Sequence, residues 1–235
     1  MLWGYKTAFS CRILDFWKNN ETNFNKAIFM SRLVNDLISK GYLSSEVIID
    51  AFYKVHRIEF IPDDLAAQAE ADIPLPIGYG QTISQPMTVA FMLELLDPKP
   101  GQNILDVGSG SGWTTGLLSY IVGDKGKVTA MEIIEELCKI GEKNVEKFGF
   151  VKKGIAEFYS DSAKNGFLQN SPYDRILVSA SVDEIPPALK QQLVLGGKMV
   201  IPVNNSIWYV EKKSEDDFHI EKFSGFAFVP FLKND

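Results

Sequence analysis

The amino-acid sequence predicts an α/β protein in which helices cover both faces of a doubly wound, mostly parallel sheet. From about residue 100 onward, short apolar runs alternate with stretches of helical periodicity, which is the pattern that βαβ units produce. The first run, residues 103–107, leads directly into a glycine-rich turn at 108–112. The tail is rich in strand-forming residues without a helical stretch between them. We therefore expect an antiparallel C-terminal hairpin at one edge of the sheet.

The composition fits one full domain with an extension. The 235 residues are 46% hydrophobic and 23% charged, a balance that supports a packed core and excludes a disordered chain. No apolar run approaches the roughly 18 residues that a membrane-spanning helix needs, so we expect a soluble protein. Acidic residues outnumber basic ones by 30 to 24, for a net charge of −6. Most proteins that bind nucleic acid show the opposite balance.

The scarcity of cysteine and histidine narrows the chemistry. The chain holds two cysteines, Cys11 and Cys138, and two histidines, His56 and His219. Two distant cysteines form neither a metal cluster nor a redox motif, and a reduced, cytoplasmic protein is the default expectation. The sequence therefore predicts no metal site and no reaction built on a histidine triad.

Residues 1–30 are predicted to be a helical N-terminal extension of a single domain that occupies residues 31–235. Charged residues interrupt this extension, so it has no continuous apolar stretch of the kind that a secretion signal needs. Its apolar residues follow helical spacing, which favours a helix packed on the domain over one that docks on a membrane or a partner. Within the domain, residues 31–100 are expected to form a helical cap with a ligand-facing loop, and residues 101–235 the sheet.

Two short amphipathic helices are expected between residues 31 and 60. Ser31 can cap the first helix and Gly41 can end it. Ser44 or Ser45 can cap the second helix. His56 falls at the end of this second helix, where a surface position or a role in the last turn is more typical than a role as a metal ligand.

The strands of the main sheet are predicted from the apolar runs, and the helices from the segments between them. The expected strands are residues 103–107, 128–131, 158–159, 175–179 and 198–203, and the expected helices are 113–122, 133–148 and 187–195. The last helix begins with Pro187, and Gly196 and Gly197 follow it as a predicted C-terminal cap. Residues 207–212 and 226–230 are expected to form the terminal hairpin.

The strongest local motif is the turn DVGSGSG, residues 106–112, which follows an expected strand and opens an expected helix. Its three glycines let the backbone approach a ligand closely and leave amide groups that point at it. Trp113 and Thr115 stand where the dinucleotide fingerprint would place its last glycine, and no Walker lysine follows. The turn therefore favours a nucleoside ligand without a pyrophosphate.

An acidic residue completes this pattern. Glu132 follows the second expected strand, where a carboxylate can accept hydrogen bonds from both hydroxyls of a ribose. The glycine turn and Glu132 together suggest S-adenosylmethionine as the ligand. The plainer alternative is a bare tight turn followed by an ordinary carboxylate at a strand end.

A longer motif, DIPLPIGYGQTISQP, occupies residues 72–86, upstream of the glycine turn. A generic methyltransferase does not carry this segment, and because of it the chain resembles the protein-L-isoaspartate O-methyltransferases. The resemblance runs from about Arg32 to the C-terminus. Further matching segments are residues 106–112, 172–180, 185–186, 191–203 and 228–230.

The resemblance implies a Rossmann-like sheet of the class I methyltransferase type and an enzyme that methylates the carboxylate of L-isoaspartyl residues in damaged proteins. The methyl ester then closes to a succinimide, and hydrolysis returns some normal aspartate. Ser84 is the implied catalytic residue, Glu132 the implied ribose ligand and Asp161 the implied adenine ligand. The implied S-adenosylmethionine site comprises Thr82, Ile83, Ser84, Gly108, Ser109, Gly110, Ser111, Gly112, Glu132, Ile133, Asp161 and Ser162. The implied partners are isoaspartyl-containing proteins or peptides, with no nucleic acid, and we expect a monomer.

The chemistry can also be argued from first principles. A carboxylate with a pKa of about 4 is already ionised at neutral pH, so its methylation needs no general base. Transfer from a sulfonium cation to an anion depends mainly on desolvation and alignment. Ser84 would then position the substrate with a hydrogen bond. The plainer interpretation is that Ser84 caps the helix that begins at Pro86.

Several positions depart from the family pattern and keep three hypotheses open. Serines flank Asp161 where the family has glycines, and residues 204–206 read NNS where the family usually has a glutamine. The first hypothesis is a repair enzyme for isoaspartyl proteins. The second is a methyltransferase for another substrate, such as an aspartate in a peptide natural product or, less in keeping with the net charge, RNA. The third is a cofactor-binding homologue without catalytic activity.

Overall fold

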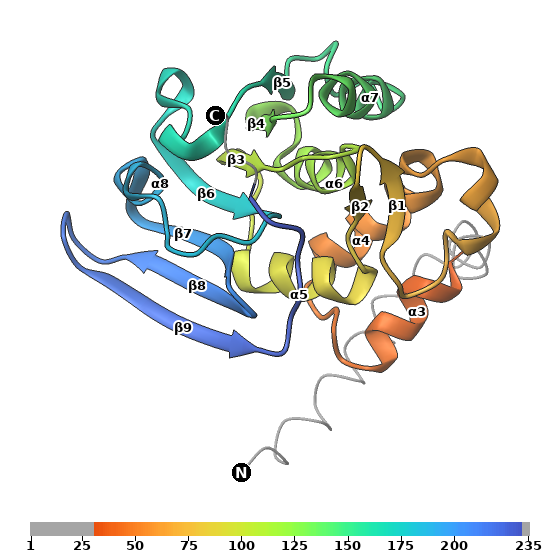
Figure 1. Cartoon of the computed structure of the whole chain (residues 1–235), viewed down its shortest axis with the longest axis horizontal. Coiled ribbons are helices and arrows are strands. Elements are labelled where there is room, and N and C mark those ends of the chain that lie inside the picture. Colours follow the sequence, from red (N-terminus) through yellow and green to blue (C-terminus); the bar gives the residue numbers. More distant parts are fainter. Residues whose placement is uncertain (1–30, 232–235) are drawn as a thin grey trace, which may run out of the picture.

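A seven-stranded sheet forms the centre of the molecule in the computed structural model, which describes residues 31–231 (Figure 1). The order of its strands is β5-β4-β3-β6-β7-β8-β9. The pairs from β5 to β7 are parallel, and β8 and β9 continue the sheet in antiparallel pairing. The strands are β3 (Asn103–Val107), β4 (Lys127–Glu132), β5 (Ala156–Ser160), β6 (Tyr173–Val178), β7 (Leu193–Val203), β8 (Ser206–Lys212) and β9 (Phe218–Ser224). The predicted fold class is therefore confirmed.

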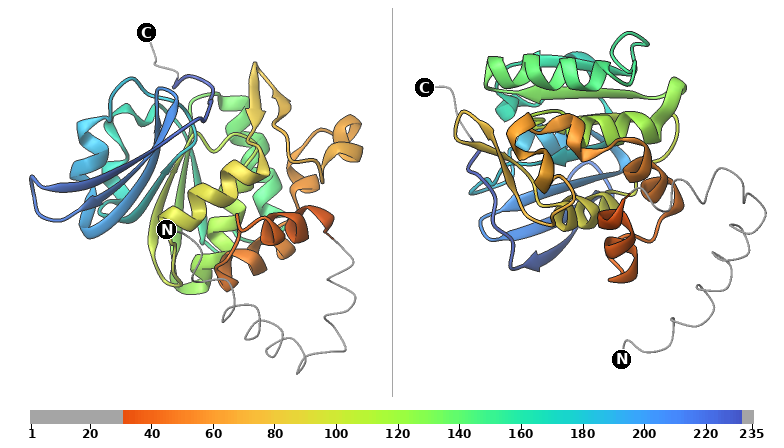
Figure 2. Two further views of the ribbon diagram at one scale, coloured as in Figure 1. Left: turned by 90° about the horizontal axis from the view of Figure 1, so that it is seen from below. Right: turned by 90° about the vertical axis from the view of Figure 1, so that its right-hand side faces the viewer.

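Helices cover the two faces of this sheet unequally. The larger part of the core lies under α3 (Arg32–Ser39), α4 (Glu46–Lys54), α5 (Pro86–Leu96), α6 (Trp113–Val122) and α7 (Glu135–Glu146). A smaller cluster lies on the other face, under α8 (Pro187–Gln191). In Figure 2, α3 and α4 lie at the opposite side of the molecule from β8 and β9. No helix among residues 31–231 is long and apolar enough to cross a membrane.

The N-terminal part of the domain differs from expectation in one detail. The Ser31 hydroxyl accepts a hydrogen bond from the Val34 amide at 3.2 Å, so the predicted cap of α3 is confirmed. Ser45 stands at the cap position of α4, but its hydroxyl donates to Glu94 Oε2 at 2.6 Å and caps no backbone amide. The Ser44 hydroxyl also donates to Glu94. The predicted helix within residues 1–30 lies outside the described residues.

Two expectations about the second half of the chain were wrong. Gly196 and Gly197 do not cap a helix, because α8 ends at Gln191 and both glycines lie inside β7. The register between β6 and β7 shifts beside them, between Tyr173 and Arg175, which is a place where a strand tolerates glycine.

The terminal hairpin is also shifted along the chain. Its second strand is β9, which ends before Gly225, a residue with φ of 98°. Residues 226–230 form no strand and make only an isolated bridge between Pro230 and Ser181. Charged residues in β9 obscure its strand character, because this edge strand is exposed along most of its length.

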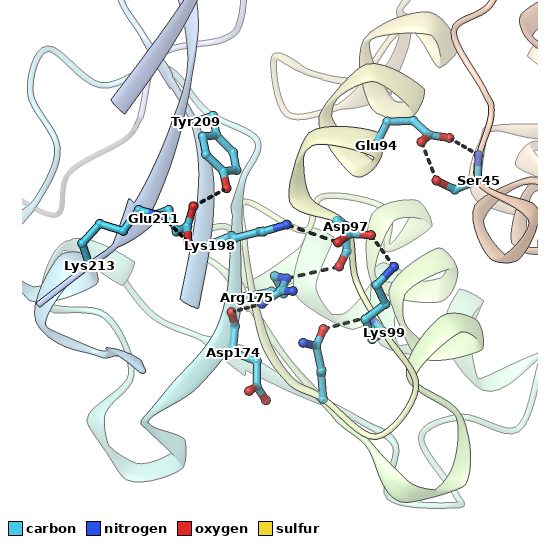
Figure 3. Close-up of polar contacts among 11 residues, drawn as sticks. Ser45, Glu94, Asp97, Lys99, Asp174, Arg175, Lys198, Tyr209, Glu211 and Lys213 are labelled. Carbon is cyan, nitrogen blue, oxygen red and sulfur yellow. Dashed lines mark hydrogen bonds and ion pairs between the residues drawn. The ribbon is translucent and has the colours of Figure 1, made fainter. Parts of the chain in front are cut away.

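Helix α5 is anchored at several points along its length. The Glu94 carboxylate accepts the backbone amides of Ser44 and Ser45 at 2.8 and 2.9 Å in addition to their hydroxyls. At the C-terminal end of the helix, Asp97 pairs with Lys198 of β7 at 3.2 Å, and its carbonyl accepts from Arg175 of β6 (Figure 3). These contacts fix the C-terminal half of α5 against α4 and against the sheet.

Candidate active site

A cavity opens at the ends of three parallel strands, beside a small separate hairpin. The hairpin consists of β1 (Leu75–Gly78) and β2 (Gln81–Ile83). The glycine turn follows β3, Glu132 ends β4, and Ser179 follows β6, and residues from all three strand ends line the cavity. The carboxyl ends of parallel strands, where the strand order reverses, are the usual ligand site of such sheets.

The cavity brings together eleven of the twelve predicted cofactor residues. These are Thr82, Ile83, Ser84, Gly108, Ser109, Gly110, Ser111, Glu132, Ile133, Asp161 and Ser162. The exception is Gly112, which is buried behind the turn and precedes α6 as its N-cap with φ of 92°. A Cβ atom on Gly112 would approach the Gly141 carbonyl oxygen of α7 to 2.8 Å. Gly112 thus permits close packing of α6 against α7 and does not itself face the cavity.

Glu132 is held rigidly at the cavity wall. The residue is buried, with only 6% of its surface exposed. Its Oε2 accepts the Gly110 amide at 2.9 Å and its Oε1 accepts the Ile134 amide at 3.0 Å. Each carboxylate oxygen can accept a second hydrogen bond, so the pair of oxygens is pre-oriented toward a ligand with two adjacent hydroxyls.

Asp106 is a second buried carboxylate at the glycine turn, and the sequence motif alone assigned it no role. Its Oδ2 accepts the hydroxyls of Thr114 (2.8 Å) and Thr115 (2.6 Å), whereas its Oδ1 is buried without a partner. Burial, with a smaller contribution from the charge of Glu132, raises the pKa of Asp106 to about 6 against the lowering effect of the two threonine hydroxyls.

These residues fit S-adenosylmethionine. Two carboxylates lie together at the glycine turn, and no lysine, arginine or histidine of the described chain lines the cavity. Asp106 Oδ1 and the hydroxyl of Ser109 are both buried without hydrogen-bond partners among the described residues, which is uncommon unless a ligand or water completes the site. Ser109 and Glu132 line the cavity, so a cationic ligand with hydroxyl and amino groups would complement the charge of Glu132 and the unpaired Ser109 hydroxyl. Asp106 is fully buried and does not line the cavity, so its charge would act on such a ligand only from behind the turn.

Asp161 lies at the far end of the cavity, after β5. Its Oδ1 accepts the Ser162 amide at 2.6 Å, and the side chain is exposed. Neither flanking serine has a positive φ. The backbone at this point therefore does not require the glycines that the family pattern places there.

Ser84 lies on the opposite wall of the cavity, between β2 and α5. Its carbonyl accepts a hydrogen bond from Arg57 at 3.3 Å. The cap position of α5 is occupied by Gln85 and not by Ser84. The Ser84 hydroxyl has no hydrogen-bond partner among the residues that the structure describes, so the helix-cap interpretation of this serine was wrong.

Part of the cavity lining was not predicted from the sequence. Val229, Pro230 and Phe231 pass along the cavity, and they are attached to the loop after β6 by hydrogen bonds from the Ser181 amide to Val229 and from the Phe231 amide to Ser181, both 2.8 Å. The match at residues 228–230 was the only sequence signal for this contact. Trp113, which begins α6, was missed as a lining residue as well.

Comparisons with known proteins agree on one family. A sequence model described as protein-L-isoaspartate(D-aspartate) O-methyltransferase matches residues 29–235. A protein-L-isoaspartate O-methyltransferase from Methanopyrus kandleri is 43% identical over 205 residues, which cover 86% of this chain and 90% of the relative.

Solved structures share the fold. A structure named protein-L-isoaspartate O-methyltransferase superposes with a TM-score of 0.79 at 28% identity, over 86% of this chain and 66% of the other. A Plasmodium falciparum chain in complex with S-adenosyl-L-homocysteine has a TM-score of 0.77 at 24% identity, over 86% of this chain and 97% of that one.

Proposed function

The chain belongs to the protein-L-isoaspartate(D-aspartate) O-methyltransferase family, and we propose that it transfers a methyl group from S-adenosylmethionine to the carboxylate of L-isoaspartyl residues. Its partners are then proteins or peptides that contain this damaged residue. The proposal is carried by one observation: Ser84, in the segment most specific to the family, faces the same cavity as the glycine turn.

The glycine turn and the two strand-end acids would hold the cofactor. Glu132 would accept the ribose hydroxyls, because its two oxygens are already oriented by backbone amides. Asp161 would contact the adenine amino group at the far end of the cavity. When bound, S-adenosylmethionine supplies an electrophilic methyl group, which the substrate carboxylate takes as the carbon–sulfur bond breaks and the electron pair remains on sulfur.

The cavity suits a reaction that needs no proton transfer. The substrate carboxylate is ionised at neutral pH, so no side chain has to deprotonate it. A lysine or arginine beside that carboxylate would stabilise the ground state more than a transition state in which charge is lost. The described cavity lining has no such residue, and its apolar walls at Ile83 and Val229 would remove water from the reacting groups.

Ser84 would orient the substrate. Its hydroxyl can donate to one oxygen of the isoaspartyl carboxylate and leave the other oxygen to react. This role requires a fixed position, since reactivity depends on contact within about 3–3.5 Å and on alignment. The backbone of Ser84 is fixed through its carbonyl, while the hydroxyl remains available.

A methyl-transfer assay with two matched peptides tests the function. One peptide contains a single isoaspartyl residue, and its twin contains normal aspartate at that position. We expect radiolabelled methyl from S-adenosylmethionine to enter only the isoaspartyl peptide, as an ester that mild base releases as methanol. Labelling of the aspartyl twin would point to another carboxylate substrate. Cofactor binding without labelling of either peptide would identify a non-catalytic homologue.

A further inference from the structure

Arg57 is an arginine buried next to the cavity, in the short 3-10 helix Arg57–Phe60 after α4. Only 4% of its surface is exposed. Its guanidinium donates to the backbone carbonyls of Ala69 (3.3 Å), Ala71 (3.1 Å), Ile73 (2.8 Å) and Ser84 (3.3 Å). No carboxylate among the described residues lies within ion-pair distance of it. The positive charge is thus used almost wholly to bind main-chain oxygens.

Three of these carbonyls belong to one segment, residues 69–73, which we call the strap. The strap is tied to the first turn of α5 as well, because Asp72 Oδ1 accepts the Met87 amide at 2.8 Å. The Gln85 side chain donates to the Asp72 carbonyl at 3.0 Å. Arg57 therefore holds the carbonyl of Ser84, and the strap holds the chain immediately after Ser84.

The other side of Arg57 contacts the wall that carries the glycine turn. The guanidinium carbon lies 5.5 Å from the centre of the Trp113 ring, within the range of a cation–π contact. Trp113 directly follows Gly112, lines the cavity and donates from its indole nitrogen to the Val55 carbonyl at 3.2 Å. Arg57 is consequently in contact with both walls of the cavity at once.

We propose that Arg57 is a positioning residue that sets the place of Ser84 relative to the glycine turn. The inference rests on the proposed function, since it assigns to Ser84 the task of orienting the substrate. Arg57 does not line the cavity, so it would touch neither the substrate nor the cofactor. It would act through the Ser84 carbonyl on one side and the Trp113 ring on the other.

The physical chemistry favours arginine in this position. Burial lowers the pKa of Arg57 to about 10, while the charges of Asp72 and Glu70 raise it, so the group stays charged at neutral pH. A planar guanidinium can donate to several carbonyls that lie in different directions, which one ammonium group cannot do. Burying a charge without a close counter-ion is unfavourable. Here the buried charge binds the carbonyls of the strap and of Ser84, which indicates that the positions of these two segments are important.

Two variants of Arg57 and one matched control test the proposal. Arg57→Met removes every donor while keeping a long side chain, and Arg57→Lys keeps the charge. The control is Arg175→Met, because Arg175 is also buried, at 8% exposure, and also binds backbone carbonyls (Figure 3). Arg175 lies near the start of β6, whereas the cavity lies where the parallel strands end.

We expect Arg57→Met to lower kcat on the isoaspartyl peptide about tenfold or more, with the Kd for S-adenosylmethionine changed by less than about threefold. Arg57→Lys should recover part of the lost turnover. Arg175→Met should lower the melting temperature without lowering kcat. The same loss of kcat in Arg175→Met, or normal kcat in folded Arg57→Met, would overturn the proposal. If Arg57→Met is insoluble, Arg57→Lys enters the same comparison, with a smaller expected loss.

A double-mutant cycle shows whether Arg57 acts through Ser84. If it does, adding Arg57→Met to Ser84→Ala should lower kcat by less than about threefold, because the hydroxyl to be positioned is already absent. A full additional tenfold loss would show an independent effect and reject the proposal.

Hydrogen exchange separates a failure of this inference from a failure of the proposed function. Arg57→Met should speed amide exchange in residues 69–86, whereas Arg175→Met should not. This comparison does not depend on turnover, so it decides the structural role even if the wild-type protein methylates neither peptide. Unchanged exchange in residues 69–86 would overturn the inference.

Discussion

The two walls of the cavity are held in place by different means. The wall at the sheet consists of the glycine turn and the ends of β3 and β4. Main-chain hydrogen bonds fix its base, where the Gly108 and Ser109 amides both donate to the Met131 carbonyl, and the side chains of Glu132 and Asn144 add bonds to the turn itself. The wall at the hairpin carries Ser84, and side chains fix it. Arg57 and Asp72 reach main-chain groups that lie 12 to 27 positions away in the sequence.

On the proposed function, this difference would place the ribose and glycine-turn contacts of the cofactor on one wall and the substrate-orienting hydroxyl of Ser84 on the other. A wall fixed by regular backbone geometry presents amides and strand-end carboxylates in the same way in many sheets of this type, and it suits a common ligand. A wall fixed by a few buried side chains can be moved by one substitution. We therefore expect substitutions at the sheet wall to affect folding and cofactor affinity, and substitutions at the hairpin wall to affect turnover.

The largest effect is expected at Gly112. Gly112→Ala would place a Cβ atom 2.8 Å from the Gly141 carbonyl oxygen at a φ of 92°. The left-handed conformation costs alanine about 1–2 kcal/mol, and overpacking adds about 1–3 kcal/mol. Unfolding experiments should show a loss of about 2–5 kcal/mol. Gly149→Ala is the control, since Gly149 has φ of 73° with nothing within 4 Å of its Cβ position; it should lose only about 1–2 kcal/mol. Equal losses would mean that α6–α7 packing does not matter here.

Asp106 gives the sheet wall a dependence on pH. Its pKa of about 6 in the folded protein lies above the ordinary value of 3.8. The folded state therefore binds the proton more tightly than the unfolded state. The tighter binding of this proton stabilises the folded state most below pH 4, and the stabilisation is lost as the pH rises to about 6. The full change is on the order of 3 kcal/mol.

Denaturant unfolding between pH 4 and 7 tests this expectation in the wild type and in Asp106→Asn. The variant should lack this component of the pH dependence. In the wild type, affinity for S-adenosylmethionine should also weaken as pH falls through about 6, because a protonated Asp106 no longer attracts a cation. An identical pH profile in the two proteins would show that Asp106 does not titrate in this range.

Glu132 should affect cofactor affinity more than turnover. Glu132→Ala removes the acceptor proposed for the ribose, a charged hydrogen-bonding group whose loss costs roughly 1.5–3 kcal/mol, or about ten- to hundredfold in Kd. Calorimetric titration with S-adenosylmethionine gives this value. The carboxylate also binds the Gly110 and Ile134 amides, so circular dichroism should be measured on the same variant to show that it remains folded. Unchanged affinity in a folded variant would reject the assignment.

The contrast between the walls also explains what the sequence could predict. The glycine turn, the bounds of α6 and the position of Glu132 follow from short-range patterns, because each strand of a parallel sheet is an apolar run followed by a turn. Arg57 gave no such signal: its four acceptors are main-chain carbonyls, and any residue type supplies a carbonyl. The same holds for residues 229–231, whose place along the cavity depends on pairing with distant Ser181.

The misplaced hairpin strand has a related cause. Residues 226–230 are more apolar than residues 218–224, yet the latter form β9. The edge strand is the segment that pairs with β8, and the side chains on its outward face can be polar. The hydrophobic pattern alone predicted a strand at residues 226–230, but this segment passes along the cavity instead.

The smallest effect in free energy, and the most informative one, is expected at Ser84. The hydroxyl makes no hydrogen bond to a described residue, so Ser84→Ala should leave the melting temperature nearly unchanged; a helix cap would have contributed about 1 kcal/mol. Turnover on the isoaspartyl peptide should nevertheless fall at least tenfold, about 1.4 kcal/mol of barrier, with little change in cofactor affinity. Ser84→Thr should also lose turnover, because an added methyl group displaces reacting groups whose placement matters within about 0.5 Å. Ser39→Ala, at an exposed position in the last turn of α3, controls for loss of a hydroxyl elsewhere. Normal turnover in Ser84→Ala would mean that Ser84 has no role in the reaction. The two walls would then differ only in the hydrogen bonds that hold them in place.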